Sequence, residues 1–136
     1  DAELDSEPVT EFADEREAYQ YAFDLFKKGR YEESLSGFEQ IIVNYPNGQY
    51  TPNAFYWTGD LYLADRDYEK SRQAFVQVIS LYPDHQKVAA AIYKLGVVYF
   101  ALGDNQAALK YLEQVQRDYP ESSAAGLASR YSSEIQ

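Results

Sequence analysis

Three tyrosines recur at a constant spacing and are the best candidates for binding chemistry in this sequence. Tyr19, Tyr56 and Tyr93 lie 37 residues apart. A tyrosine ring presents a broad apolar face and a polar tip, so a row of such rings suits contact with a peptide or helix of another protein. Alternatively, neighbouring rings only stack on each other. The spacing alone is compatible with both interpretations.

Catalytic and metal chemistry finds little support. The chain has no cysteine, which excludes a thiol nucleophile and a Cys-ligated zinc. His85 is the only histidine, and we expect it and its neighbour Asp84 to be solvated. Glu32 and Glu33 are expected at a helix N-terminus, where acidic side chains favour the helix dipole rather than acid–base catalysis. A hydrolase would need a second carboxylate beside Asp60. The sequence therefore predicts a protein that is not an enzyme and uses no metal or cofactor.

Composition indicates one folded domain that does not bind nucleic acid. The chain has 136 residues, 46% of them apolar, and a net charge of −10. Such a charge opposes general binding to phosphate backbones. The apolar runs are too short to cross a bilayer, and no apolar signal peptide precedes Asp1. Because methionine is absent even at position 1, we expect a mature or trimmed piece of a longer protein.

The negative charge is concentrated near the N-terminus. Residues 1–17 carry eight acidic side chains against the single base Arg16, whereas the rest of the chain is only mildly acidic. We expect residues 1–11 to be an acidic linker or tail and residues 12–136 to form the folded domain. The alternative is that the acidic segment is an arm that binds a basic partner.

The strongest signal is an internal repeat. The dipeptide Tyr-Pro begins at residues 45, 82 and 119, and the same interval relates Phe38 to Phe75. A fixed period of this length is typical of stacked repeat architectures. The sequence predicts three units and a closing helix, at about 15–51, 52–88, 89–125 and 122–135.

Within each unit the apolar spacing is helical. In the second unit Phe55, Gly59 and Tyr62 recur at intervals of four and three, which places them on one helix face. Asp67 is expected to cap a second helix, which Pro83 prevents from continuing. Each unit is thus predicted to be an antiparallel helix pair, with Gly59 at the point where the two helices approach closely.

These residues resemble the tetratricopeptide repeat family. The pattern in the second unit consists of Phe55, Gly59, Tyr62, Tyr68, Ser71, Phe75 and Pro83. The resemblance implies an all-α fold, a right-handed superhelix of three 37-residue helix pairs plus a C-terminal capping helix. The period exceeds the family's usual 34 by three residues, which fall in the loop after each Tyr-Pro. The closing helix is expected to cover the last unit with the apolar residues Ala124, Leu127, Tyr131 and Ile135.

A narrower resemblance rests on the run Y-P-x-x-x-Y-x-P-N-A-x-Y-W-x-G at residues 45–59. It is similar to the C-terminal repeat domain of the Tol-Pal-associated cell division coordinators, the CpoB or YbgF family. That resemblance implies a periplasmic module of a Gram-negative bacterium that binds TolA and coordinates peptidoglycan synthesis with outer-membrane constriction. It further implies possible contact with the peptidoglycan synthase machinery and trimerisation through a coiled coil absent here. The alternative is a scaffold subunit of an outer-membrane protein assembly complex.

The tetratricopeptide resemblance also implies where a partner binds, namely a concave groove lined by the first helix of each unit. Asp60 and Lys94 are expected to pair with each other or to read one polar group of the partner. A clamp for a C-terminal carboxylate is not expected, because Lys94 is the only basic residue at the positions that would form it. Trp57 is expected to pack between helices rather than touch a ligand. The predicted partner-binding residues are Tyr19, Phe23, Phe26, Asn53, Tyr56, Asp60, Leu63, Tyr93, Lys94, Val97 and Phe100.

Overall fold

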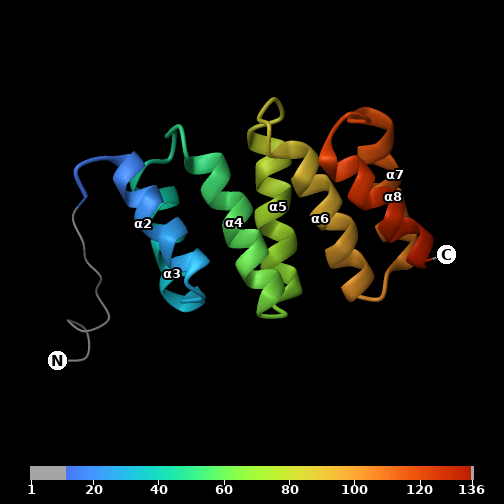
Figure 1. The fold of residues 1–136 in the computed structure, drawn as a ribbon, viewed down its shortest axis with the longest axis horizontal. Helices are drawn as coiled ribbons and strands as arrows, with labels where there is room; N and C mark the ends of the chain where they lie inside the picture. Colours follow the sequence, from blue (N-terminus) through green and yellow to red (C-terminus); the bar gives the residue numbers. More distant parts are fainter. Residues whose placement is uncertain (1–11, 136) are drawn as a thin grey trace.

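The chain folds into a row of helices that follow one another in sequence order (Figure 1). The structure is a computed structural model, and it describes residues 12–135, so the predicted acidic tail at 1–11 lies outside the described residues. The predicted all-α superhelix of three helix pairs and a capping helix is confirmed. The helices are α2 (Glu15–Lys27), α3 (Tyr31–Asn44), α4 (Thr51–Ala64), α5 (Tyr68–Leu81), α6 (Val88–Ala101), α7 (Asn105–Asp118) and α8 (Ser123–Ile135).

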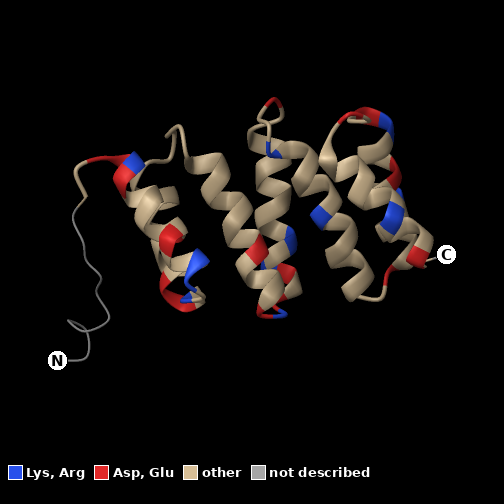
Figure 2. Ribbon diagram, viewed as in Figure 1, with Lys and Arg blue, Asp and Glu red and all other residues tan. Residues whose placement is uncertain are grey.

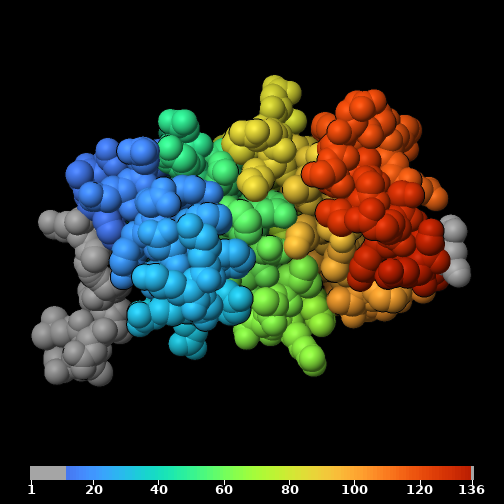
Figure 3. Space-filling model, viewed as in Figure 1, coloured from blue at the N-terminus to red at the C-terminus, as the bar shows by residue number. Residues whose placement is uncertain are grey.

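The helices pack as antiparallel pairs, and each pair packs on the next. α2 packs with α3, α4 with α5 and α6 with α7, while α8 closes the row against α7. The space-filling view shows the consecutive segments as adjacent layers (Figure 3). Phe38, Phe75 and Leu112 occupy the same position in the three units, and each is fully buried. The 37-residue period is therefore a period of the core.

The two helices of a pair approach most closely at a glycine. A Cβ atom added to Gly59 would lie 2.8 Å from the ring of Phe75, and one added to Gly96 would lie 2.6 Å from the side chain of Leu112. Neither position has room for a methyl group unless the buried neighbour moves. The predicted role of Gly59 is confirmed, and it fixes how closely α4 lies to α5.

Acidic caps begin the second helices of the second and third units. The Asp67 carboxylate accepts a hydrogen bond from the backbone N–H of Lys70, as predicted, and Asp104 accepts one from Ala107 in the third unit. Each bond satisfies an N–H that the first helical turn leaves without a partner. The turn before Asp67 places Arg66 at a φ of 65°, a left-handed conformation that glycine more often adopts.

The closing helix covers the last unit with alanines together with Tyr131 and Ile135, but not with Leu127. Ala124, Ala125 and Ala128 are buried, whereas Leu127 keeps 41% of its surface exposed. The prediction for Leu127 is wrong, because α8 turns its small side chains inward and so approaches its neighbours closely. Tyr131 is half-buried and packs against the core, as predicted.

The first helices lie on the inner side of the curve. α6 approaches both α4 and α8 directly, although a second helix separates each of these from it in sequence. Among the described residues, no comparable approach joins α3 to α5 or α5 to α7. Side chains on α2, α4, α6 and α8 that point away from the second helices therefore share one inner face.

Candidate binding face on the first helices

Four aromatic side chains gather where α2 meets α4, and we call them the Trp57 cluster: Tyr19, Phe23, Phe26 and Trp57. The Trp57 ring lies 5.3 Å from the Phe23 ring and 5.0 Å from the Phe26 ring, measured between centroids. Tilted contacts at this separation are favourable between aromatic rings. All four side chains are only half-buried, so the cluster both joins the first two units and offers apolar surface to solvent.

Hydrogen bonding fixes the cluster at Tyr19. The indole N–H of Trp57 donates to the Tyr19 hydroxyl over 3.0 Å, and the Tyr19 ring stacks on Tyr50 at 4.8 Å. Burial raises the pKa of Tyr19, while hydrogen bonds from Trp57 and Asn53 act in the opposite direction. The hydroxyl is therefore a structural acceptor, and it holds the indole in one orientation.

The three tyrosines of the predicted ladder have unequal environments. Tyr56 is only 7% exposed, and its ring packs edge-on against Phe75 at 5.5 Å. Burial raises its pKa well above the ordinary range. Tyr19 and Tyr93 are half-buried, and Tyr93 packs edge-on against Tyr131. In residues 12–135 no ring contact joins two members of the ladder. Tyr56 thus belongs mainly to the core.

Lys87, just before α6, lies over the faces of two aromatic rings. Its ammonium nitrogen is 4.6 Å from the centroid of Tyr56 and 4.8 Å from that of Trp57. Both distances are within the range in which a cation is attracted to an aromatic face. Partial burial lowers the pKa of Lys87, and nearby Asp60 opposes that shift.

The expected pair between the second and third units is present. The carboxylate of Asp60 on α4 lies 2.7 Å from the ammonium of Lys94 on α6. Both side chains are largely buried, so the pair is screened less than one at the surface. It links two first helices across the inner face.

Apolar residues continue this face toward the C-terminus. Leu63 and Val97 are half-buried, and Phe100 at the end of α6 is 41% exposed. The Phe100 ring packs edge-on against Tyr131 of α8 at 5.7 Å. Asn53 on α4 is also half-buried. Every predicted binding residue thus lies on one of the first helices, α2, α4 or α6.

His85 is only partly solvated, which modifies the prediction. It is half-buried in the loop before α6, and its Nδ1 accepts a hydrogen bond from the backbone N–H of Lys87 over 3.0 Å. Burial is the main cause that lowers its pKa. The neutral imidazole helps to order the loop that places Lys87, whereas Asp84 is exposed, as predicted.

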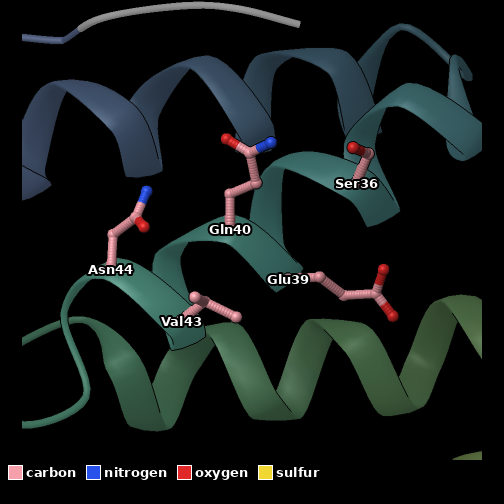
Figure 4. A pocket seen from close by; sticks show the side chains of 5 residues that line it. All are labelled: Ser36, Glu39, Gln40, Val43 and Asn44. Atoms are coloured by element: carbon pink, nitrogen blue, oxygen red, sulfur yellow. The ribbon is translucent and has the colours of Figure 1, made fainter. Parts of the chain in front are cut away.

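A hollow on the surface of α3 lies apart from this face. Figure 4 shows a shallow hollow whose lining comes from α3 alone: Ser36, Glu39, Gln40, Val43 and Asn44. Glu39 there accepts a hydrogen bond from the Tyr62 hydroxyl, which raises the pKa of Tyr62 to about 12. Residues 12–135 hold no group of three or more potential metal ligands.

The distribution of charges and the length of the helices are relevant to nucleic-acid and membrane partners. Acidic and basic positions are intermixed along the row (Figure 2). In the described part of the chain, no helix combines the length and the apolar character needed to pass through a bilayer.

Sequence reasoning missed two residues of this face. It assigned Trp57 to packing between helices, and that packing is confirmed, yet part of the indole stays accessible. Lys87 was missed because it precedes the helix, where the repeat pattern names no position. Trp57 in the second unit and Lys94 in the third occupy the same position of the repeat. This change from an aromatic to a basic residue was the one signal in the sequence that the position is not purely structural.

Sequence comparison finds two matches to the tetratricopeptide repeat. One family model matches residues 50–121, just over half of the chain, and a second matches residues 18–48. The cell division coordinator CpoB of Pseudomonas putida is 41% identical over 55 residues, which are 40% of this chain. The match covers only 20% of the length of that protein.

Solved structures share the fold at low sequence identity. The type III secretion translocator chaperone SycD of Yersinia enterocolitica superposes with a TM-score of 0.75 and 16% identity, over 89% of this chain and 90% of SycD. The first repeat domain of Spaghetti (RPAP3), bound to an HSP90 peptide, gives a TM-score of 0.74 and 19% identity over 90% and 92% of the two chains. The second such domain of human RPAP3, in complex with an HSP70 peptide, gives 0.72 and 20% over 87% and 91%.

Proposed function

Because the chain belongs to the tetratricopeptide repeat family, we propose that it is a protein-binding module that holds a segment of a partner on its inner face. The fold is a stack of helix pairs, and such stacks commonly present an extended concave surface to a partner. The binding residues are those of α2, α4 and α6 that point inward, from Tyr19 to Phe100.

One observation carries the proposal: the Trp57 cluster leaves aromatic surface accessible at the junction of the first two units. Half-buried aromatic side chains held in place by their neighbours are frequent anchors of protein interfaces. Here the ring contacts within the cluster and the hydrogen bond from Trp57 to Tyr19 fix the rings before any partner arrives. Such preorganisation lowers the entropy lost on binding.

For the partner we propose TolA, and for the location the periplasm of a Gram-negative bacterium. The support is the run at residues 45–59 together with the similarity of part of the chain to a cell division coordinator. In this role the module helps to coordinate peptidoglycan synthesis with outer-membrane constriction. The trimeric state belongs to the longer protein and to its coiled coil.

Calorimetric titration with the periplasmic part of TolA tests this function. The informative variant is Phe23→Ala, because Phe23 contacts Trp57 and is half-buried rather than part of the core. We expect it to weaken binding by about 2 kcal/mol, as for an anchor in the centre of an interface. The matched control is Val43→Ala, since Val43 on α3 is 75% exposed and lies away from the first helices.

Saturable binding that Phe23→Ala weakens and Val43→Ala leaves unchanged supports the proposal, provided circular dichroism shows both variants folded. Equal loss of binding in the two variants contradicts a site on the inner face. Absence of TolA binding to the unaltered chain contradicts the named partner.

A further inference from the structure

Lys87 stands out because its charge is held close to apolar surface. Its ammonium lies over the rings of Tyr56 and Trp57, and its side chain is half-buried. Partial burial disfavours the charged form, which is why its pKa is lowered. An additional carboxylate next to the ammonium would therefore be more favourable here than at a fully hydrated lysine.

Two ion pairs beside these aromatic rings do not involve Lys87. Asp60 lies 2.7 Å from Lys94, and Lys27, whose ammonium is 5.3 Å from the Phe23 ring, lies 3.6 Å from Asp24. None of the ion pairs found in residues 12–135 includes Lys87. Although the whole chain carries a net charge of −10, Lys87 thus places on the inner face a positive charge that no ion pair of the described residues neutralises.

This positive charge borders the apolar surface of the Trp57 cluster. Trp57 forms the boundary, since its ring lies 4.8 Å from the Lys87 ammonium and also packs on Phe23 and Phe26. A ligand that covers the accessible part of this indole would therefore lie within reach of both the cation and the aromatic rings.

From this charge complementarity we propose that the inner face selects a partner segment that presents a carboxylate side chain next to an aromatic or aliphatic anchor. The anchor packs on Phe23, Phe26 and Trp57, and the carboxylate accepts a hydrogen bond from Lys87. This inference rests on the proposed function and names the chemistry of the segment. It needs no C-terminal carboxylate, because Lys87 acts on a side chain.

The probe for this site is 3-phenylpropanoate, which joins one aromatic ring to one carboxylate. Its neutral counterpart, 3-phenylpropanamide, has the same shape without the charge. The chain has a single tryptophan, so one indole N–H resonance reports directly on occupation of the site. We expect a saturable shift of that resonance with the acid, and about fivefold weaker binding of the amide, the size of one partly exposed ion pair.

Charge variants show whether Lys87 is the residue that discriminates. Lys87→Gln should weaken binding of the acid about fivefold and leave binding of the amide nearly unchanged. Lys87→Arg keeps the cation and should restore the preference for the acid. The matched control is Lys110→Gln, because Lys110 is exposed on α7 and changes the net charge equally.

Two results would overturn the inference: equal binding of acid and amide to the unaltered chain, or an unchanged preference in Lys87→Gln. No saturable shift up to the solubility limit of the probe also counts against it. A titration with TolA separates this inference from the proposed function. If TolA binds the unaltered chain and Lys87→Gln equally well, the selected chemistry is wrong and the binding function stands. If the probes discriminate as expected but TolA does not bind, the named partner is wrong and the inference stands.

Discussion

The substitution Gly59→Ala tests how closely the helices of the second unit approach. In an exposed helix interior this change stabilises a protein by about 1 kcal/mol, because alanine has the higher helix propensity. At Gly59, however, the new Cβ atom would lie 2.8 Å from two ring atoms of Phe75, whose side chain is fully buried. Overpacking a core in this way costs about 1–3 kcal/mol. We therefore expect a net loss of up to about 2 kcal/mol in the free energy of unfolding.

The matched control is the same substitution at Gly126, for which we expect a gain instead of a loss in the free energy of unfolding. Gly126 lies in α8, and a Cβ atom added there would meet nothing within 4 Å. Gly126→Ala should raise the free energy of unfolding by about 0.5–1 kcal/mol. Urea denaturation followed by circular dichroism measures both variants. If Gly59→Ala stabilises the chain as much as Gly126→Ala does, α4 and α5 do not approach as described, and the inner face they position is misplaced.

Three further predictions concern single side chains. Tyr56→Ala should reduce the free energy of unfolding by about 3–5 kcal/mol while Tyr56→Phe changes it by less than about 1 kcal/mol, because the ring and not the hydroxyl fills the core; urea denaturation checks both. NMR titration should find the pKa of His85 below its ordinary value of 6.5. Because the folded-state pKa is the lower one, the contribution of His85 to stability is complete above about pH 6.5. It is lost as the pH falls from there through the folded-state pKa. His85→Gln should flatten that dependence of the urea midpoint. Asp104→Ala should cost about 1 kcal/mol in the same assay through loss of the cap on Ala107, and an unchanged midpoint would contradict the capping role.

The fold was predictable because its constraints are periodic. The same space in each unit must be filled by an apolar side chain, namely Phe38, Phe75 and Leu112. Gly59 must leave room for Phe75. These packing requirements recur in each unit and therefore produce the 37-residue interval in the sequence. In the closing helix the prediction was wrong at Leu127 alone. There the spacing favoured Leu127, but no following unit imposes the repeat pattern, and a close approach is made with alanines instead.

The candidate site was predictable only in part. The repeat pattern placed Tyr19, Tyr56 and Tyr93 on the first helices, yet it could not show that Tyr56 is buried against the core while the other two remain accessible. That difference depends on which side chains each ring meets on neighbouring helices. The role of Lys87 could not be predicted for another reason. Its position over two rings depends on the path of the loop that His85 helps to order.

One inward-facing position differs between units in chemical character, whereas the core position of Phe38, Phe75 and Leu112 stays apolar throughout. One place on the first helix holds Phe23, then Asp60, then Val97, and each side chain is half-buried. The stack imposes no common residue type there, because Phe23 packs on Trp57 whereas Asp60 pairs with Lys94. A partner segment that lies along the inner face would meet aromatic rings at the first junction, the pair of Asp60 and Lys94 at the second, and aliphatic and aromatic surface beyond. Because this order is not symmetric, we expect a segment bound on the proposed face to take one direction, which a row of identical tyrosines would not impose.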